Sequence, residues 1–282
     1  MAPKTMMDLL FKHDVYVICL GDPFQLPPVS DGEDNQLLSS PHVFLDEIMR
    51  QAQESEIIRL SMKIRNQEPI EYFCGKEAKI IPYSEANTGL LQWGDQILTA
   101  TNARRQAVNN QMRALEGRDG APTDGDKVIC LRNYWDDFSE NENALINGTI
   151  GILSNTYKTW RNIPRFIKGA PHSLDVLAGD LILPGEDDVY KNLEMDYNMF
   201  LTGKKCVDWK LSYRLSKLKY KYGEIVPKEF DFAYAVTYWK SQGSEWDKVV
   251  VLEESFPFDR ETHAKALYTA VTRSSKQLVW VR

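Results

Sequence analysis

The sequence predicts an α/β fold that contains a buried parallel sheet. Three short apolar runs carry this prediction: residues 15–20 (VYVICL), 232–237 (FAYAVT) and 249–252 (VVVL). Runs that are apolar at every position are typical of strands covered on both faces, as in parallel sheets. The first two runs lead into polar segments, and strand ends are where such a sheet presents functional side chains. On pattern alone, an ordinary strand–loop–strand of a globular core is the alternative.

Size and composition allow a sizeable core and exclude several classes of protein. The chain has 282 residues, 43% of them hydrophobic, and a net charge of −6, which together indicate one or two domains. There is no apolar run long enough to span a membrane and no signal-peptide pattern, so we expect a cytoplasmic protein. The acidic balance argues against a wholly basic nucleic-acid-coating protein but permits a local basic groove.

The cysteines and histidines give no indication of a metal site. The four cysteines are widely spaced without a C-x-x-C pair, and the four histidines form no H-E-x-x-H pair. This spacing fits free thiols in a reducing cytosol better than a disulfide framework or a zinc site. We therefore expect no metal ligands in this sequence.

The first apolar run leads into a proline-rich loop, GDPFQLPPV, at residues 21–29. A proline-stiffened connection after a strand is its ordinary interpretation. Gln25 lies within this loop, and its amide can both donate and accept hydrogen bonds. That chemistry suits a network of phosphate oxygens and water.

A helix is expected after residues 44–51 (FLDEIMRQ), because apolar residues then recur at helical spacing. Arg50, taken alone, is a surface arginine near a helix start. Residues 96–102 (QILTATN) predict a short strand that ends in cap residues and leads into a second helix. Its first turn contains Arg104 and Arg105. A solvent-exposed helix face is the favoured interpretation of these two arginines, and contact with the DNA backbone is the alternative.

From about residue 126 the pattern changes to short strands. Residues 126–133 and 145–153 flank an acidic loop, and N-G-x-x-G in a strand context is typical of small barrels. The pattern assigns no structure to residues 157–200. Irregular stretches of this length are usually either functional or poorly ordered.

Residues 204–222 are basic and aromatic. Leu211, Tyr213 and Leu215 alternate with polar residues, which predicts a strand over part of the segment. Two interpretations remain open. Lysines could meet phosphates while bases lie on the aromatic rings of a single-strand path, or lysines could blunt the edge of a hairpin with an aromatic core. For the first, the candidate contacts are Lys217, Lys219 and Tyr220.

The C-terminal segment predicts a helix over residues 263–272 and a closing strand over 277–281. Arg273 follows the helix directly. An arginine at a helix end ordinarily compensates the helix dipole.

Four segments match, in order, motifs of superfamily 1 DNA helicases. Residues 21–28 (GDPFQLPP) resemble motif III, and residues 45–51 (LDEIMRQ) resemble motif IV of the Dda/RecD-like branch, superfamily 1B. Residues 235–247 (AVTYWKSQGSEWD) resemble motif V, with Trp239 where the family has His, and residues 267–273 (LYTAVTR) resemble motif VI. The sequence therefore resembles the C-terminal portion of a superfamily 1B helicase, from motif III to motif VI.

The resemblance implies a RecA-like, P-loop-NTPase-type architecture. Residues 1–45 would be a remnant of the first motor domain. Residues 46–125 plus 229–282 would form the second motor domain, and residues 126–228 an inserted SH3-like β-barrel.

The resemblance also implies ATP–Mg²⁺ hydrolysis that drives 5′-to-3′ movement on single-stranded DNA, in replication, recombination or repair within a bacterial cell. Gln25, Arg50 and Arg273 would be catalytic at the γ-phosphate, because a planar, permanently charged guanidinium stabilises transition-state charge there. The implied site residues are Gln25, Arg50, Gly243, Glu245 and Arg273 for the nucleotide, and Thr237, Trp239 and Lys240 for DNA. The indole of Trp239 could stack on a base.

No G-x-x-x-x-G-K-[ST] phosphate loop occurs in the 282 residues. In the family this loop and an acidic D-E pair hold the β- and γ-phosphates and magnesium. We therefore expect negligible ATP hydrolysis by this chain alone, with an N-terminal P-loop domain acting in trans, and an unpaired first strand. The alternative is a non-catalytic DNA-binding or interaction module that kept the helicase fold. A third, weaker alternative is an RNA helicase or a nuclease-associated subunit.

Overall fold

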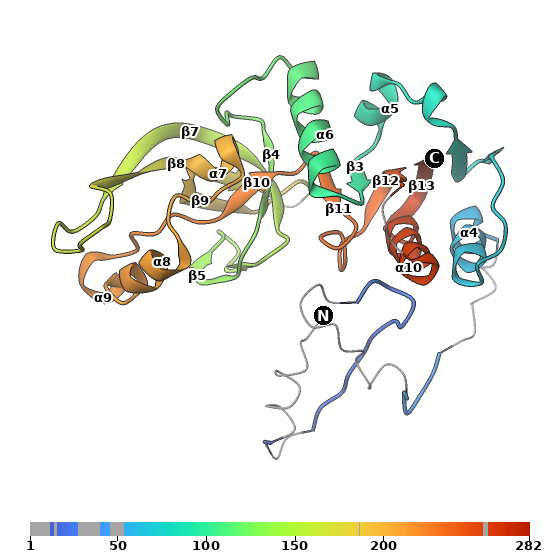
Figure 1. Ribbon diagram of the computed structural model, residues 1–282, viewed down its shortest axis with the longest axis horizontal. Helices are drawn as coiled ribbons and strands as arrows, with labels where there is room; N and C mark the ends of the chain where they lie inside the picture. Colours follow the sequence, from blue (N-terminus) through green and yellow to red (C-terminus); the bar gives the residue numbers. More distant parts are fainter. Residues whose placement is uncertain (1–11, 14–15, 28–39, 46–53, 186, 256–258) are drawn as a thin grey trace. The chain divides into compact units, whose positions relative to one another are not determined.

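The computed structural model describes residues 12–13, 16–27, 40–45, 54–185, 187–255 and 259–282, which form two compact units (Figure 1). Unit 1 comprises Met1–Arg105 and Val236–Arg282, and unit 2 comprises Gln106–Ala235. Within the described ranges, no helix is long and apolar enough to cross a bilayer. Arg50, the candidate of motif IV, lies outside the described residues.

Unit 1 contains a six-stranded sheet in the order β1-β2-β13-β12-β3-β11. Strands β2, β13, β12 and β3 run parallel, and β1 pairs with β2 in the antiparallel direction. Helices α4 and α10 lie side by side (Figure 1). The bounds are β1 (Phe73–Cys74), β2 (Ala78–Ile81), β3 (Gln96–Thr99), β11 (Ala235–Thr237), β12 (Trp246–Leu252), β13 (Ser274–Val281), α4 (Glu56–Arg65), α5 (Thr88–Trp93), α10 (Arg260–Val271) and a 3₁₀ turn at Tyr83–Glu85.

The central strands of this sheet confirm the parallel arrangement that the apolar runs predicted. Val249, Val250 and Val251 in β12 are fully buried, as a strand covered on both faces must be. The predicted C-terminal helix is also present, but it begins at Arg260, three positions before the expected start. The carboxylate of Asp259 accepts a hydrogen bond from the Thr262 backbone N–H at 2.9 Å, and this cap fixes the earlier start.

The strand predicted over residues 15–20 is wrong for its described part. Residues 16–20 form no strand, and Tyr16, Ile18 and Leu20 are almost fully exposed. A strand is stable only where neighbours satisfy its backbone groups and cover its apolar side chains. Within the described residues, no strand pairs with this run.

Unit 2 contains a five-stranded antiparallel sheet in the order β10-β4-β7-β8-β9 and a two-stranded pair, β5 and β6. Helix α6 begins in unit 1 and continues into unit 2. The bounds are α6 (Asn102–Leu115), β4 (Lys127–Cys130), β5 (Tyr134–Phe138), β6 (Ala144–Leu145), β7 (Ile150–Asn162), β8 (Ser173–Ile182), β9 (Val189–Asp196), α7 (Tyr197–Thr202), α8 (Trp209–Ser216), α9 (Lys219–Tyr222) and β10 (Phe230–Phe232). The SH3-like assignment stays a prediction.

The stretch 157–200 is regular, although the sequence pattern assigned it no structure. It contains the second half of β7, all of β8 and β9, and the beginning of α7. The β7–β8 register shifts between Ser154 and Tyr157, and Asn155 lies there with a positive φ of 53°. A bulge of this kind breaks the alternation of apolar and polar residues by which a strand is found in a sequence.

The apolar run 232–237, predicted as one strand, is divided between two sheets. Phe232 ends β10 in unit 2, and Ala235 begins β11 in the sheet of unit 1. The buried amide of Asn109 holds the break. Its Nδ2 donates to the carbonyls of Phe232 at 3.0 Å and Ala235 at 3.2 Å, and its Oδ1 accepts from the Ala235 N–H at 2.7 Å. The backbone groups that leave the ladder are thereby satisfied.

The strand predicted within residues 204–222 is also wrong, because the segment forms α8 and α9. The carboxylate of Asp208 accepts from the Leu211 N–H at 2.7 Å and caps α8. Leu211 and Leu215, four residues apart, share the face of α8 that packs on a small apolar cluster with Ile163 and Leu174. A spacing of four fits a helix as well as the alternation fits a strand.

A buried ion pair ties α6 to the start of β4 in unit 2. Arg113 donates from Nε to Oδ1 of Asp126 at 3.0 Å and from Nη2 to Oδ2 at 3.1 Å, and both side chains are almost fully buried. The guanidinium also donates to the carbonyls of Gly120 at 2.9 Å and Ala121 at 2.7 Å. Four of the five N–H donors of Arg113 are thus used, and a buried charge is tolerated when it is paired and hydrogen-bonded in this way.

Replacing Arg113 by Met removes the close, bidentate partner of the buried Asp126 carboxylate and leaves only the Arg118 guanidinium, 3.9 Å away, as a countercharge. We expect Arg113→Met to lower the free energy of unfolding by about 3–5 kcal/mol. Arg161→Met is the matched control, since it breaks the exposed pair with Glu194 in the same unit and should cost about 1 kcal/mol or less. Urea unfolding of both variants measures the difference, and equal losses would contradict it.

Candidate functional site

Three of the predicted motifs meet at Leu26 in unit 1. This residue is fully buried, although it lies in the otherwise partly exposed loop 21–27. Its N–H donates to Oγ1 of Thr269 in α10 at 2.9 Å, and its carbonyl accepts from Nε2 of Gln242 at 2.8 Å. Thr269 belongs to motif VI and Gln242 to motif V. The loop of motif III is therefore docked on both through its backbone.

The loop is shaped by its own aspartate. Oδ1 of Asp22 accepts from the Phe24 N–H at 2.9 Å, and Oδ2 accepts from Nε2 of Gln25 at 3.4 Å. The Gln25 N–H also donates to the Asp22 carbonyl at 3.2 Å. This turn keeps the Gln25 side chain half-exposed beside an acidic group, and its amide oxygen remains available as an acceptor.

Arg273 is held close to this loop by the end of α10. Its Nε donates to the Thr269 carbonyl at 3.0 Å, Nη1 to the Ser244 carbonyl at 3.3 Å, and Nη2 to Oγ1 of Thr272 at 3.1 Å. Partial burial lowers the pKa of Arg273, while the negative charges of Glu245 and Asp22 act in the opposite direction. The guanidinium thus caps the helix. It also interacts electrostatically with Asp22 of the loop and Glu245 of motif V.

Aromatic contacts complete the packing between the loop and the helices. Phe24 packs edge-on against Tyr268, with ring centroids 6.3 Å apart, and the Arg65 guanidinium lies 3.7 Å from the centroid of the Phe24 ring. Burial raises the pKa of Tyr268 to about 12, with a further contribution from the Asp22 carboxylate. A hollow of about 220 Å³ lies against these side chains.

The predicted DNA-side residues lie at the end of β11 and on the turn that leads to β12. Thr237 is buried, Trp239 half-buried and Lys240 exposed, and the Lys240 N–H contacts Oγ1 of Thr237 at 3.4 Å. Gly243 follows with a φ of 87°, a backbone conformation that favours glycine. The turn thus carries both the DNA candidates and the nucleotide candidates Gly243 and Glu245.

The remaining candidates belong to unit 2. Tyr220 is fully exposed on α9, and Lys217 follows the last residue of α8. Lys219 forms an ion pair with Asp136 at 2.7 Å, and that contact raises its pKa. These three residues form a surface, whereas Gln25, Gly243, Glu245 and Arg273 form a cluster.

Sequence reasoning missed the side chains that hold the cluster together. Thr269 and Gln242 dock Leu26, and Asp22 orients Gln25. All three lie inside the motif segments, but Thr269 and Gln242 act by bonding backbone groups far away in the sequence. A sequence pattern carries no signal for such a contact.

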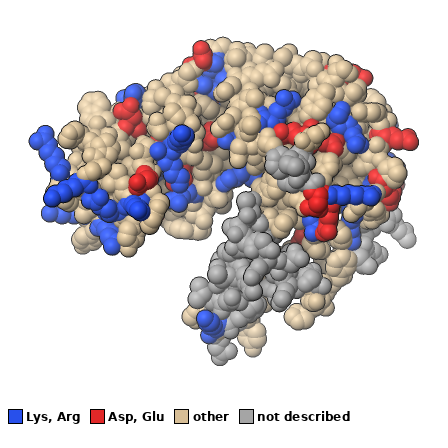
Figure 2. All heavy atoms as spheres, in the orientation of Figure 1, with Lys and Arg blue, Asp and Glu red and all other residues tan. Residues whose placement is uncertain are grey.

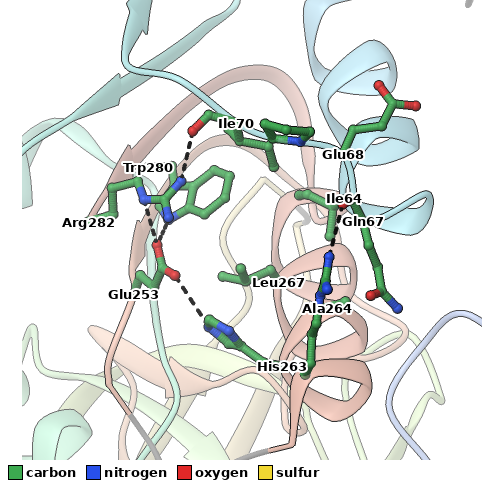
Figure 3. A pocket seen from close by; sticks show the side chains of 12 residues that line it. Ile64, Gln67, Glu68, Ile70, Glu253, His263, Ala264, Leu267, Trp280 and Arg282 are labelled. Atoms are coloured by element: carbon green, nitrogen blue, oxygen red, sulfur yellow. Dashed lines mark hydrogen bonds and ion pairs between the residues drawn. The ribbon is translucent and has the colours of Figure 1, made fainter.

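A second hollow, of about 330 Å³, lies between α4, α10 and the end of β13 (Figure 3). At its edge the carboxylate of Glu253 accepts from Nε1 of Trp280 at 2.9 Å and pairs with Arg282 and His263, each at 3.3 Å. Arg282 also donates to the Ile70 carbonyl at 3.2 Å. These contacts fasten the last strand to the sheet. In the described ranges, no three His, Cys, Asp or Glu side chains gather in a way that could hold a metal ion.

Comparison with known proteins supports the motif assignment over the C-terminal segment. Residues 232–281 match the family model of the UvrD-like helicase C-terminal domain. This segment contains the turn after β11, all of α10 and Arg273. The predicted resemblance to superfamily 1 helicases is thus confirmed, and the chain carries a helicase-type C-terminal segment within a mixed α/β fold. No curated protein matches the sequence.

Solved structures of Pif1 helicases are similar at low identity. Pif1 from Candida albicans is 18% identical, with a TM-score of 0.45 over 92% of this chain and 63% of that one. Pif1 from Bacteroides in complex with ADP-AlF3 and ssDNA is 16% identical, with a TM-score of 0.45 over 92% of this chain and 60% of that one. Bacteroides Pif1 bound to ssDNA is 15% identical, with a TM-score of 0.45 over 98% and 65%. The chain therefore spans less than two thirds of these proteins, and such TM-scores support no further argument.

Docking of the motif III loop should depend on the hydroxyl of Thr269. In Thr269→Val the shape is kept, but the buried Leu26 N–H loses its acceptor, at a cost of about 1–3 kcal/mol. We expect faster amide hydrogen exchange in the peptide that contains residues 16–27. Thr202→Val, which removes an exposed hydroxyl bonded to a helix carbonyl, is the control. Unchanged exchange in the loop peptide would contradict the docking.

The raised pKa of Tyr268 predicts a pH dependence at the alkaline end. An unfolded tyrosine ionises near pH 10, about two units lower than folded Tyr268, so the neutral form is favoured by folding. The stabilisation is complete at pH values well below 10 and is lost as the pH rises through about 12. Tyr268→Phe removes the ionisation, and the difference in unfolding free energy between wild type and variant should change over that window. A constant difference would exclude the raised pKa.

Proposed function

We propose that this chain contributes the second half of the nucleotide site of an ATP-dependent helicase that moves 5′-to-3′ on single-stranded DNA, in replication, recombination or repair. The observation that carries the proposal is the meeting of motifs III, V and VI at Leu26, beside Arg273. The three motif segments are joined by hydrogen bonds, and two of them, motifs V and VI, fall within the match to the UvrD-like helicase C-terminal domain.

Arg273 and Gln25 are the proposed γ-phosphate contacts, with Arg50 as a third that lies outside the described residues. Arg273 donates to backbone carbonyls and a hydroxyl, and such bonds can be exchanged for stronger, charge-assisted bonds to phosphate oxygens. Its fork of donors matches phosphate geometry. Gln25 can donate to a phosphate oxygen or accept from water beside it.

ATP and Mg²⁺ are the proposed cofactors, and these residues fit only part of their site. The phosphate-loop motif is absent from the 282 residues, and the described part of the chain gathers no set of metal ligands. The groups that hold the β- and γ-phosphates and the metal ion have to come from a P-loop domain outside these residues. We propose that such a domain acts with this chain in the cytoplasm, and that without it the chain does not hydrolyse ATP.

The domain assignment belongs to the same proposal. Residues 1–45 form the part contributed to the first motor domain, and residues 46–125 with 229–282 the second motor domain. Residues 126–228 form an SH3-like insertion. The parallel sheet of unit 1 and the antiparallel sheet of unit 2 support a separate insertion, although unit 2 runs from Gln106 to Ala235 and includes β10.

The second candidate function is a non-catalytic DNA-binding or interaction module that keeps the helicase fold. The lack of a phosphate-loop motif in the sequence favours it. The two candidates differ in one measurable respect, since only the motor requires Arg273 for nucleotide turnover.

Single-stranded-DNA-stimulated ATP hydrolysis tests the proposal. We expect no turnover by the chain alone, and turnover when a superfamily 1B P-loop domain is added. Arg273→Ala should then lower kcat by about 10³-fold or more, as for other arginine fingers, and Arg273→Lys should not restore it.

Arg104→Ala, at an exposed arginine in the first turn of α6, is the matched control and should leave the rate within about twofold. An Arg273→Ala variant that retains full turnover would exclude the finger role. Turnover by the chain alone that is lost in Arg273→Ala would mean that these residues contain a phosphate site of their own. If no P-loop domain restores turnover but DNA binding persists, the module is the better description.

A further inference from the structure

Helix α8 presents aromatic rings outwards along one line. Trp209 and Tyr213 are four residues apart, and Lys217 continues the same line at the end of the helix. The exposed fractions are 74% for Trp209 and 58% for Tyr213, far above what core aromatics show. Residues four apart on a helix are neighbours on its surface, about 6 Å apart along the axis. We call Trp209, Tyr213 and Lys217 the α8 stripe.

The opposite face of α8 anchors it. Leu215 is 1% exposed and packs with Val207, Ile163 and Ile225 in a small apolar cluster. The helix is capped by Asp208, and Arg214 donates to the Lys168 carbonyl at 3.3 Å. The aromatic rings of the stripe therefore project from a fixed support and are not needed to build the core.

Positive charge accompanies the rings. The ammonium group of Lys217 lies 4.3 Å from the centroid of the Tyr213 ring, and that of Lys210 lies 5.8 Å from the centroid of the Trp209 ring. Figure 2 shows lysine and arginine gathered over the part of unit 2 that contains α8 and α9. The acidic residue nearest in sequence, Asp208, is engaged as the helix cap. Asp136 and Glu224, beside α9, pair with Lys219.

We propose that the α8 stripe binds single-stranded DNA irrespective of sequence, with bases stacked on Trp209 and Tyr213 and phosphates beside Lys210 and Lys217. Stacking on an exposed ring requires an unpaired base face, which duplex DNA does not offer, and every base has such a face. Lys219 contributes less than its place in the sequence indicates, because Asp136 already neutralises it. The inference depends on the proposed function only for the class of ligand.

Binding of a short fluorescent oligothymidylate to the full chain tests the stripe. A second probe has the same sugar-phosphate chain but no bases, so it reports phosphate contacts alone. We expect Trp209→Ala and Tyr213→Ala each to weaken oligothymidylate binding about tenfold and to leave binding of the abasic strand unchanged. Lys217→Ala should weaken both probes and reduce the slope of log affinity against log salt by about one.

Tyr157→Ala is the matched control, because Tyr157 is an equally exposed aromatic of unit 2 on β7. It should leave both affinities unchanged. Equal affinity of wild type for the two probes, or no loss in Trp209→Ala and Tyr213→Ala, would overturn the stripe. Tighter binding of oligouridylate than of oligothymidylate would overturn DNA as its ligand. None of these outcomes depends on ATP turnover. The stripe proposal can therefore be wrong while the motor assignment is right, and the motor assignment can be wrong while the stripe proposal is right.

Discussion

The side chain of Asn109 makes the hydrogen bonds on which the two sheets depend. The chain between Phe232 and Ala235 leaves the antiparallel ladder of unit 2 and enters the strand that precedes motif V. Buried peptide groups at such a break are costly unless they are hydrogen-bonded. The Asn109 amide bonds two of the carbonyls and one N–H there. A continuous apolar run can therefore serve two sheets, and the strand β11 starts at a defined residue.

Much of the fold could be predicted, because a strand that is buried on both faces is apolar at every position. The run 249–252 and the helix before Arg273 were found because every position, or every third and fourth, is apolar. The structure of residues 157–200 was not found, because a bulge shifts the alternation and exposed residues such as Trp160 occur along β7. The α8 segment is predicted as a strand but forms a helix. Leu211 and Leu215 are four residues apart, and this spacing fits both the period of two of a strand and one face of a helix. Only tertiary packing decides between these periods.

The sequence predicted which residues belong to the candidate site, but not the contacts that bring them together. The motif strings gave Gln25, Gly243, Glu245 and Arg273, and the structure gathers them in unit 1. The contacts that gather them are backbone bonds from Leu26 to Thr269 and Gln242, which no periodicity records. Arg273 also shows why alternative roles for one residue need not exclude each other. It caps α10, and the same guanidinium lies near Asp22 and Glu245.

The division of unit 1 into two stretches of sequence has a consequence for the order of folding. Strands β3 and β12 are neighbours in its sheet, yet the whole of unit 2 separates them along the chain. During synthesis the first stretch emerges without the strands that complete its sheet, whereas unit 2 is contiguous and can form first. A folded unit 2 then brings the two stretches of unit 1 together and reduces the entropy lost on closing so long a loop. From this connectivity we expect the parallel sheet, and with it the cluster at Leu26, to form last.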